Sequence, residues 1–150
     1  DRTEDLSNGI DTMISGFLFS TNELLKRIDQ CKEKISVLFL VKEYPSKYEM
    51  ISSKTAGIVP ASTIVSAAQA AFCALAESFA ANAGERDYLS VVLAKCTFTN
   101  ELYKNEDAIA DWVVSALNTV KTLKNPQTVK QACTWNKVGA KLSTGFALFR

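Results

Sequence analysis

The chain has 150 residues, of which 47% are hydrophobic and 22% charged, and its formal net charge is +1. This length fits a single domain, residues 1–150, that can bury a hydrophobic core, and the composition excludes a disordered chain. A net charge near zero argues against nucleic acid as a partner, because phosphate binding needs a basic surface. No run of 18 apolar residues occurs, so we expect no transmembrane segment.

The chain contains no histidine. This excludes Ser-His-Asp and Cys-His nucleophile systems, as well as metal sites built on imidazole. Zinc-ribbon spacing, phosphate-binding glycine motifs and calcium-loop patterns are also missing, so we expect no metal and no cofactor. A hydrolase or lyase could still use carboxylates, for which Glu77 and the group Glu106, Asp107 and Asp111 are the candidates. Structural roles explain these acids better, and we expect no enzymatic activity.

The apolar residues from Ile10 to Leu38 recur every three or four positions, which predicts one long helix over residues 7–42. Gly16 inside it is expected to mark a bend or a close contact with another helix. The pair Tyr44-Pro45 should end the helix, because the residue before proline resists the helical conformation.

The rest of the chain is expected to form further helices. A short helix is predicted over 46–55, and an alanine-rich helix should begin after Ser62 and end at Gly84. A helix beginning at 85–87 follows; a short strand within 91–99 is the alternative, although no partner strand is visible. Two more helices are predicted after Asn105 and from Pro126 onward. This order predicts an all-α fold: an up-and-down bundle of five to six helices with a long N-terminal helix.

Four cysteines, Cys31, Cys73, Cys96 and Cys133, lie within the predicted helices. They favour two disulfides that join helices over four buried free thiols. Cys73–Cys96 with Cys31–Cys133 is one pairing, and Cys31–Cys73 with Cys96–Cys133 is the other. The even number of cysteines and the start at Asp1 without an initiator methionine favour a secreted, extracellular protein.

Three short segments carry more apolar residues than one helix stripe can bury. Their aromatic side chains form the candidate surface for a protein partner or an apolar ligand: Phe17, Phe19, Phe39, Phe146 and Phe149. Plain core packing, an internal cavity and an exposed binding patch are the open interpretations. Spacings of seven and four residues also place Lys130, Lys137 and Lys141 on one face of the last predicted helix. This candidate basic face could bind an anionic partner or a membrane surface.

These features predict a secreted, non-enzymatic binding protein, similar in behaviour to an inhibitor or an effector, that acts through protein–protein contact. The alternative is a carrier that holds a small hydrophobic ligand, such as a lipid, in a cavity between helices.

Overall fold

The structure is a computed structural model that describes residues 2–53, 58–84, 86–123 and 125–142. In chain order its elements are α1 (Arg2–Ile10), the π-helical segment η1 (Asp11–Ser15), α2 (Gly16–Cys31), β1 (Ile35–Lys42), α3 (Lys47–Ser53), α4 (Thr63–Ala83), β2 (Leu89–Cys96), α5 (Glu106–Lys121), α6 (Val129–Ala132) and β3 (Trp135–Lys137). The protein is therefore a mixed α/β protein, and the prediction of an all-α helical bundle is wrong.

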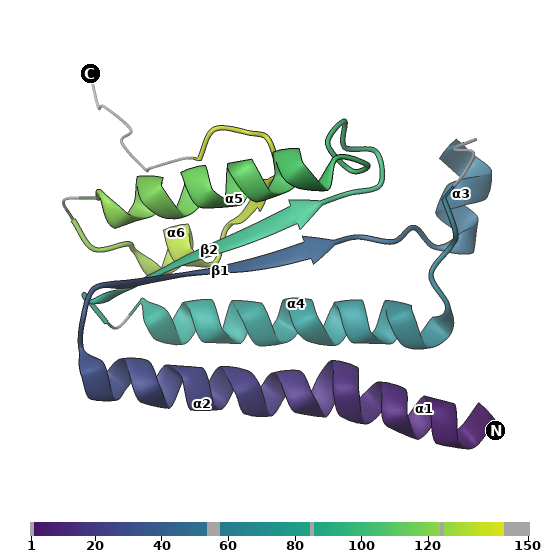
Figure 1. The fold of residues 1–150 in the computed structure, drawn as a ribbon, viewed down its shortest axis with the longest axis horizontal. Helices are drawn as coiled ribbons and strands as arrows, with labels where there is room; N and C mark the ends of the chain where they lie inside the picture. Colours follow the sequence, from purple (N-terminus) through teal and green to yellow (C-terminus); the bar gives the residue numbers. More distant parts are fainter. Residues whose placement is uncertain (1, 54–57, 85, 124, 143–150) are drawn as a thin grey trace.

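The three strands form one parallel sheet in the order β1-β2-β3. β1 pairs with β2 without interruption, from Ile35 opposite Leu89 to Lys42 opposite Cys96. β3 is much shorter and pairs only with residues 93–95 of β2. In Figure 1 the sheet lies between α5 on one side and α4 with α2 on the other.

The two long crossover connections run over opposite faces of the sheet. α4 joins β1 to β2, and its side chains pack with Phe39 and Leu93, whereas α5 joins β2 to β3 and packs with Ala94. Across the sheet, however, the strands follow one another in chain order, so both connections move the chain in the same direction. The two connections must therefore have opposite hands, so one of them departs from the right-handed rule for parallel strands.

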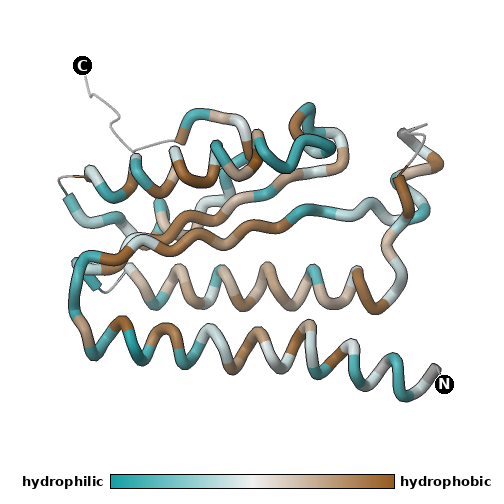
Figure 2. Tube along the Cα trace, in the orientation of Figure 1, coloured by the Kyte–Doolittle hydropathy of each residue, from teal (hydrophilic) through white to brown (hydrophobic). Residues whose placement is uncertain are grey.

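Residues 35–42, predicted as the end of the first helix, form the edge strand β1. Helix α2 ends at Cys31, followed by Lys32 in the left-handed conformation with a φ of 52°. A parallel strand with helices on both faces is apolar on both sides, so its sequence does not alternate. Phe39 accordingly packs on the side of α2 and α4, and Leu38 packs on the side of α5. In Figure 2 brown, the hydrophobic end of the scale, covers most of β1.

The second long strand, β2, lies where the sequence favoured a helix and allowed a strand as the alternative. Its partner strand, β1, lies in the segment for which the sequence predicts the end of the first helix, so no partner for β2 was expected. The last predicted helix is also shorter than expected. Only Val129–Ala132 are helical, and the following residues Trp135–Lys137 form β3.

Local signals for helix ends agree with the structure. The N–H of Val65 donates to Ser62 Oγ (3.4 Å), and the N–H of Ala108 donates to Asn105 Oδ1 (3.0 Å), so both residues cap their helices. α4 ends at Ala83, directly before Gly84. Gly16 does not break its helix: its N–H donates to the Asp11 carbonyl, five residues earlier, which is the bond that closes a π-helical turn.

The core consists of two clusters, one on each face of the sheet. The cluster between the sheet and helices α2 and α4 is aromatic: the Phe39 and Phe79 rings are 5.0 Å apart, and those of Phe17 and Phe72 are 4.5 Å apart. The cluster under α5 is built from smaller residues, among them Ala94 and Cys96. Burial on both faces explains why the middle strand has the least exposed side chains.

Among the described residues, α4 is the one helix long and apolar enough to cross a membrane. In this fold one side of it packs against the core through Ala76, Phe79 and Ala80. The other side exposes small residues such as Ala67 and Ala74. Core helices of globular proteins have the same length and composition, so the absence of a transmembrane segment stays a prediction.

Candidate functional site: the outer edge of strand β1

The outer edge of β1 presents backbone groups that nothing in the sheet uses. Odd-numbered residues point toward β2: the N–H of Ile35 donates to the Tyr88 carbonyl (2.9 Å), and the N–H of Glu43 donates to the Cys96 carbonyl (2.9 Å). Because successive residues of a strand alternate, the even-numbered ones point away from β2. Within the described part of the chain, the backbone N–H groups of the even-numbered residues donate no hydrogen bond and their C=O groups accept none: Ser36, Leu38, Leu40 and Lys42.

The side chains of β1 are also less buried than those of β2. Residues 91–94 of β2 expose at most 2% of their surface. In β1, by contrast, Leu38 and Leu40 are only half-buried, although helices cover both faces of this strand as well. β2 has a strand on each side, whereas β1 has one on a single side. The exposed apolar surface therefore follows from the missing neighbour strand.

Soluble proteins usually protect a sheet edge with proline, a bulge, a very short strand or charges. β1 has eight residues without proline or glycine, and its pairing with β2 contains no bulge. Its one charged side chain, Lys42, is directed to the α5 face: Nζ lies 3.1 Å from Glu106 Oε1 and 5.0 Å from the centre of the Tyr103 ring. The hydrogen bond that Lys42 donates to the Glu106 carboxylate raises the pKa of Lys42. The charge of this lysine is therefore directed to the α5 face rather than along the edge.

The opposite side of the sheet is protected. There the Val91 N–H donates to Gln127 Oε1 (2.7 Å), and Asn136 Nδ2 donates to the Leu93 carbonyl (3.1 Å). β3 itself is only three residues long, and Gly139, with a φ of 86°, turns the chain shortly after it. Side chains thus bond the groups of β2 that β3 does not reach, and β3 itself is short, so β1 is the longer open edge of the sheet.

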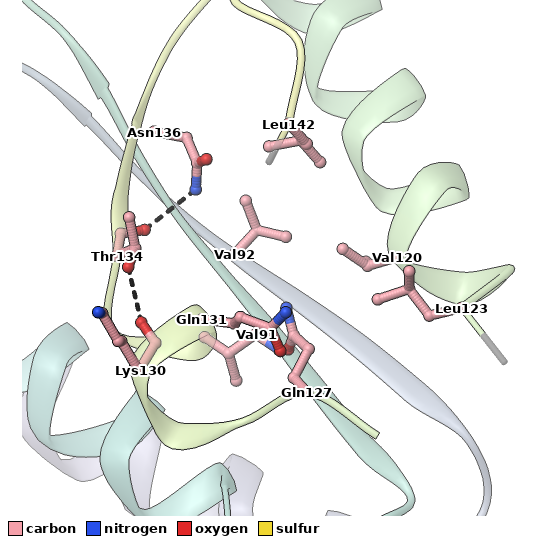
Figure 3. A pocket seen from close by; sticks show the side chains of 10 residues that line it. All are labelled: Val91, Val92, Val120, Leu123, Gln127, Lys130, Gln131, Thr134, Asn136 and Leu142. Atoms are coloured by element: carbon pink, nitrogen blue, oxygen red, sulfur yellow. Dashed lines mark hydrogen bonds between the residues drawn. The ribbon is translucent and has the colours of Figure 1, made fainter. Parts of the chain in front are cut away.

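A small cavity lies beside this protected side, between β2, α5 and α6 (Figure 3). Its volume is about 180 Å³, and valines and leucines face glutamine, threonine and asparagine side chains across it. The lining residues are Val91, Val92, Val120, Leu123, Gln127, Lys130, Gln131, Thr134, Asn136 and Leu142. Three other hollows at the surface measure about 240 to 270 Å³. Ligand pockets are usually larger, from roughly 300 Å³ upward.

The described members of the predicted aromatic surface differ widely in exposure. Phe39 is buried, and Phe17 is half-buried against it with their ring centres 6.2 Å apart. Phe19 is 71% exposed on α2. Phe146 and Phe149 lie outside the described residues. Two of the five therefore belong to the core, and the apolar excess around Phe39 is explained by a strand covered on both faces.

The three lysines of the predicted basic face are all exposed but do not share a helix. Lys130 is in α6, Lys137 is in β3, and Lys141 follows β3. The three lysines would share a helix face only if the last helix continued beyond Ala132, where α6 ends. What these lysines bind stays open.

All four cysteines are free, so the predicted disulfides are wrong. Cys96 packs in the cluster under α5, whereas Cys73 belongs to α4 on the opposite side of the sheet. Burial raises the pKa of the Cys73, Cys96 and Cys133 thiols, and Cys31 is exposed. An extracellular location no longer has disulfides to support it and stays a prediction.

The two carboxylate candidates lie on opposite faces of the sheet. Glu77 on α4 accepts a hydrogen bond from Trp135 Nε1 (2.6 Å), and Glu106 at the start of α5 pairs with Lys42. Asp107 and Asp111 lie with Glu106 in α5. Among the described residues, no group of three or more Asp, Glu and Cys side chains is arranged to hold a metal ion.

No family model matches this chain, and no curated protein or solved structure is significantly similar to it. The outer edge of β1 remains the longest unpaired strand edge of the described chain.

Proposed function

We propose that this chain is a non-enzymatic binding protein that acts through protein–protein contact, and that its binding element is the outer edge of β1. A partner would add an extended strand to the sheet at this edge. One observation carries the proposal. The backbone N–H and C=O groups of the four outward-pointing residues of β1 have no hydrogen-bond partner among the described residues of the chain: Ser36, Leu38, Leu40 and Lys42.

Two kinds of contact would stabilise such a complex. The backbone groups of the edge would form a regular ladder, which binds any extended strand without regard to its sequence. The half-buried side chains Leu38 and Leu40 would be covered on the α5 face, and Val37 on the other. These apolar contacts would add affinity in proportion to the area they bury, about 25 cal/mol per Å², and would select partner strands that are apolar on both faces.

Amide hydrogen exchange at single residues tests the proposal. In dilute protein without a bound partner, the inward amides of Val37, Phe39 and Val41 should exchange slowly, because they donate to β2. The outward amides of Leu38 and Leu40 should exchange quickly. Binding of a partner should slow the outward amides and leave the inward ones unchanged. A bound partner that leaves the outward amides unprotected would contradict the proposal.

A pair of variants at one position separates the backbone contact from the side chain. Ser36→Pro removes an outward N–H without breaking the ladder to β2, because edge strands tolerate proline on their free side. Ser36→Ala keeps the N–H and removes only the hydroxyl. Ser36→Pro should lose the partner captured by the wild-type protein, and Ser36→Ala should retain it, with equal circular dichroism spectra for both. Retention by both variants would argue against strand addition.

A carrier of a small apolar ligand is the second candidate, and the cavity in Figure 3 is the observation that favours it. Its volume of about 180 Å³ suits a ligand well below lipid size. Native mass spectrometry of the purified protein should then show a bound small molecule. Val92→Phe, which adds a larger side chain to the cavity lining, should remove it. A wild-type spectrum with the protein mass alone would count against a carrier.

A further inference from the structure

We infer that the strand added to β1 is β1 of a second copy of this chain, running antiparallel across a twofold axis. This inference rests on the proposed function and names its partner. Most protein dimers have twofold symmetry, in which the same surface of both copies forms the contact. In a parallel pair the two strands use different hydrogen-bond patterns, so exchanging them changes the pair. In an antiparallel pair both strands use the same pattern, so a twofold axis between identical strands requires the antiparallel arrangement.

The direction of the peptide groups restricts the register. Only even-numbered residues of β1 point outward, so hydrogen-bonded pairs must join even positions of one copy to even positions of the other. Two registers give nearly full overlap of Ile35–Lys42 under this condition. One places the twofold axis at Leu38, and the other places it at Phe39.

The charges next to the strand distinguish these two registers. An axis at Leu38 would place Lys34 opposite Lys42 of the second copy, and like charges directly opposite each other destabilise a strand pair. An axis at Phe39 instead places Lys42 opposite Ser36 and Lys34 opposite Tyr44. The register centred on Phe39 therefore places no two like charges directly opposite each other over residues 34–44.

In this register the facing residues are apolar on both sides of the sheet. On the α5 side Leu38 faces Leu40, and on the other side Val37 faces Val41 while Phe39 faces its own copy. The four hydrogen-bonded pairs would contribute about eight backbone hydrogen bonds, two for each pair. The half-buried side chains of β1 would then gain the second neighbour strand that β2 already has.

In this dimer the layers of the fold would stay aligned across the two copies. A twofold axis perpendicular to the sheet keeps α5 of both copies on one face and α2 with α4 on the other, so the sheet would continue as six strands. In Figure 1 β1 lies in front of β2, and no helix crosses its outer edge. The net charge of +1 adds little repulsion between two copies.

Sedimentation velocity over a concentration series tests the dimer and its register together. The wild-type chain should sediment as a dimer that dissociates on dilution. Ser36→Lys places a lysine opposite Lys42 at two symmetric positions and should weaken the dimer, roughly 2- to 30-fold. Ser36→Glu places an opposite charge there and should tighten it by a similar factor. Thr134→Lys, a matched control at the opposite side of the sheet, should leave the dimer unchanged.

The outcomes separate this inference from the proposed function. Equal weakening by Ser36→Lys and Ser36→Glu would overturn the register centred on Phe39. The chain could stay monomeric at every concentration and still protect its outward amides on binding another protein. That result would contradict the dimer but support the addition of a partner strand at β1. A monomeric chain whose outward amides stay unprotected with every captured protein would overturn both. Urea unfolding of each variant identifies any that fails to fold. In that case, hydrogen exchange of the Leu38 amide in concentrated and dilute wild-type protein decides whether the chain dimerises through β1.

Discussion

The Asp29 carboxylate near the end of α2 binds Arg86 and Tyr88, which lie between α4 and β2. Arg86 Nη2 donates to Asp29 Oδ2 at 2.9 Å, Arg86 Nε donates to Oδ1 at 2.5 Å, and the Tyr88 hydroxyl donates to Oδ1 at 2.9 Å. These contacts join the N-terminal helix to the start of the central strand. The hydrogen bond from Arg86, followed by that from Tyr88, lowers the pKa of Asp29 to about 2.

This contact predicts a specific loss of stability in acid. A carboxylate whose pKa is lower in the folded chain stabilises it at pH values above the unfolded pKa of about 3.8, and this stabilisation disappears as the pH falls toward 2. Asp29→Asn should therefore have a lower urea midpoint than wild type at pH 7, and the difference should shrink between about pH 4 and pH 2. Glu23→Gln, at an exposed ion pair on the same helix, is the control and should change the midpoint little. A constant difference between Asp29→Asn and wild type across this range would contradict the prediction.

Gly84 is required by the close approach of α6. A Cβ at Gly84 would overlap the Val129 side chain and lie 3.0 Å from the Val129 Cα. Because the φ of Gly84 is −62°, the backbone itself would accept alanine, and the cost is purely steric. Gly84→Ala should lower the free energy of unfolding by about 1–3 kcal/mol. The double variant with Val129→Ala should recover part of this loss in urea unfolding, and a simple sum of the two single effects would argue against the contact.

Phe39 and Phe19 should differ strongly when each is replaced by alanine. Phe39 is 6% exposed and contacts the rings of Phe17, Phe72 and Phe79, so Phe39→Ala should cost about 3–5 kcal/mol of unfolding free energy. Phe19 is 71% exposed, and Phe19→Ala should change stability by no more than about 0.5 kcal/mol. Chemical denaturation measures both, and similar costs would contradict the placement of β1 between its helix layers.

The four thiols should be reduced and should react at different rates. The intact mass should not change on treatment with a reductant, whereas reduction of two disulfides would raise it by the mass of about four hydrogens. Cys31 is exposed and should react first with a maleimide. Cys96 is 0% exposed, and burial raises its thiol pKa, so it should react only when the chain unfolds. Mass spectrometry of digested samples assigns each modified residue, and early labelling of Cys96 would contradict the structure.

Helix boundaries were predictable because their causes are local. The caps Ser62 and Asn105 each accept a hydrogen bond from the backbone three residues further along the chain. The stop of α4 at Gly84 likewise depends on its immediate neighbours. Signals of this kind are present in the sequence itself, which is why α4 and α5 lie where they were expected.

The strands were not predictable in the same way. The residues Ile35 and Leu38 continue the spacing of the preceding helix, so the pattern fits both a helix and a fully buried strand. Only pairing decides between them, and Ile35 pairs with Leu89, 54 positions further along the chain. Placing β1 in a helix also removed the partner of β2. One ambiguous segment therefore changed the predicted fold from mixed α/β to all-α, and hid the open edge that forms the candidate site.

The sequence by itself determined the near-neutral charge, the absence of histidine side chains and the ends of the central helices, because composition and local hydrogen bonding suffice for these. Tertiary structure alone decided that residues 35–42 form an edge strand, that Cys73 and Cys96 lie on opposite sides of the sheet, and that Lys42 turns toward Glu106. The physical reason is that strand pairing and burial depend on residues distant in the chain. An unpaired edge such as that of β1 exists only once those distant residues have come together in the sheet.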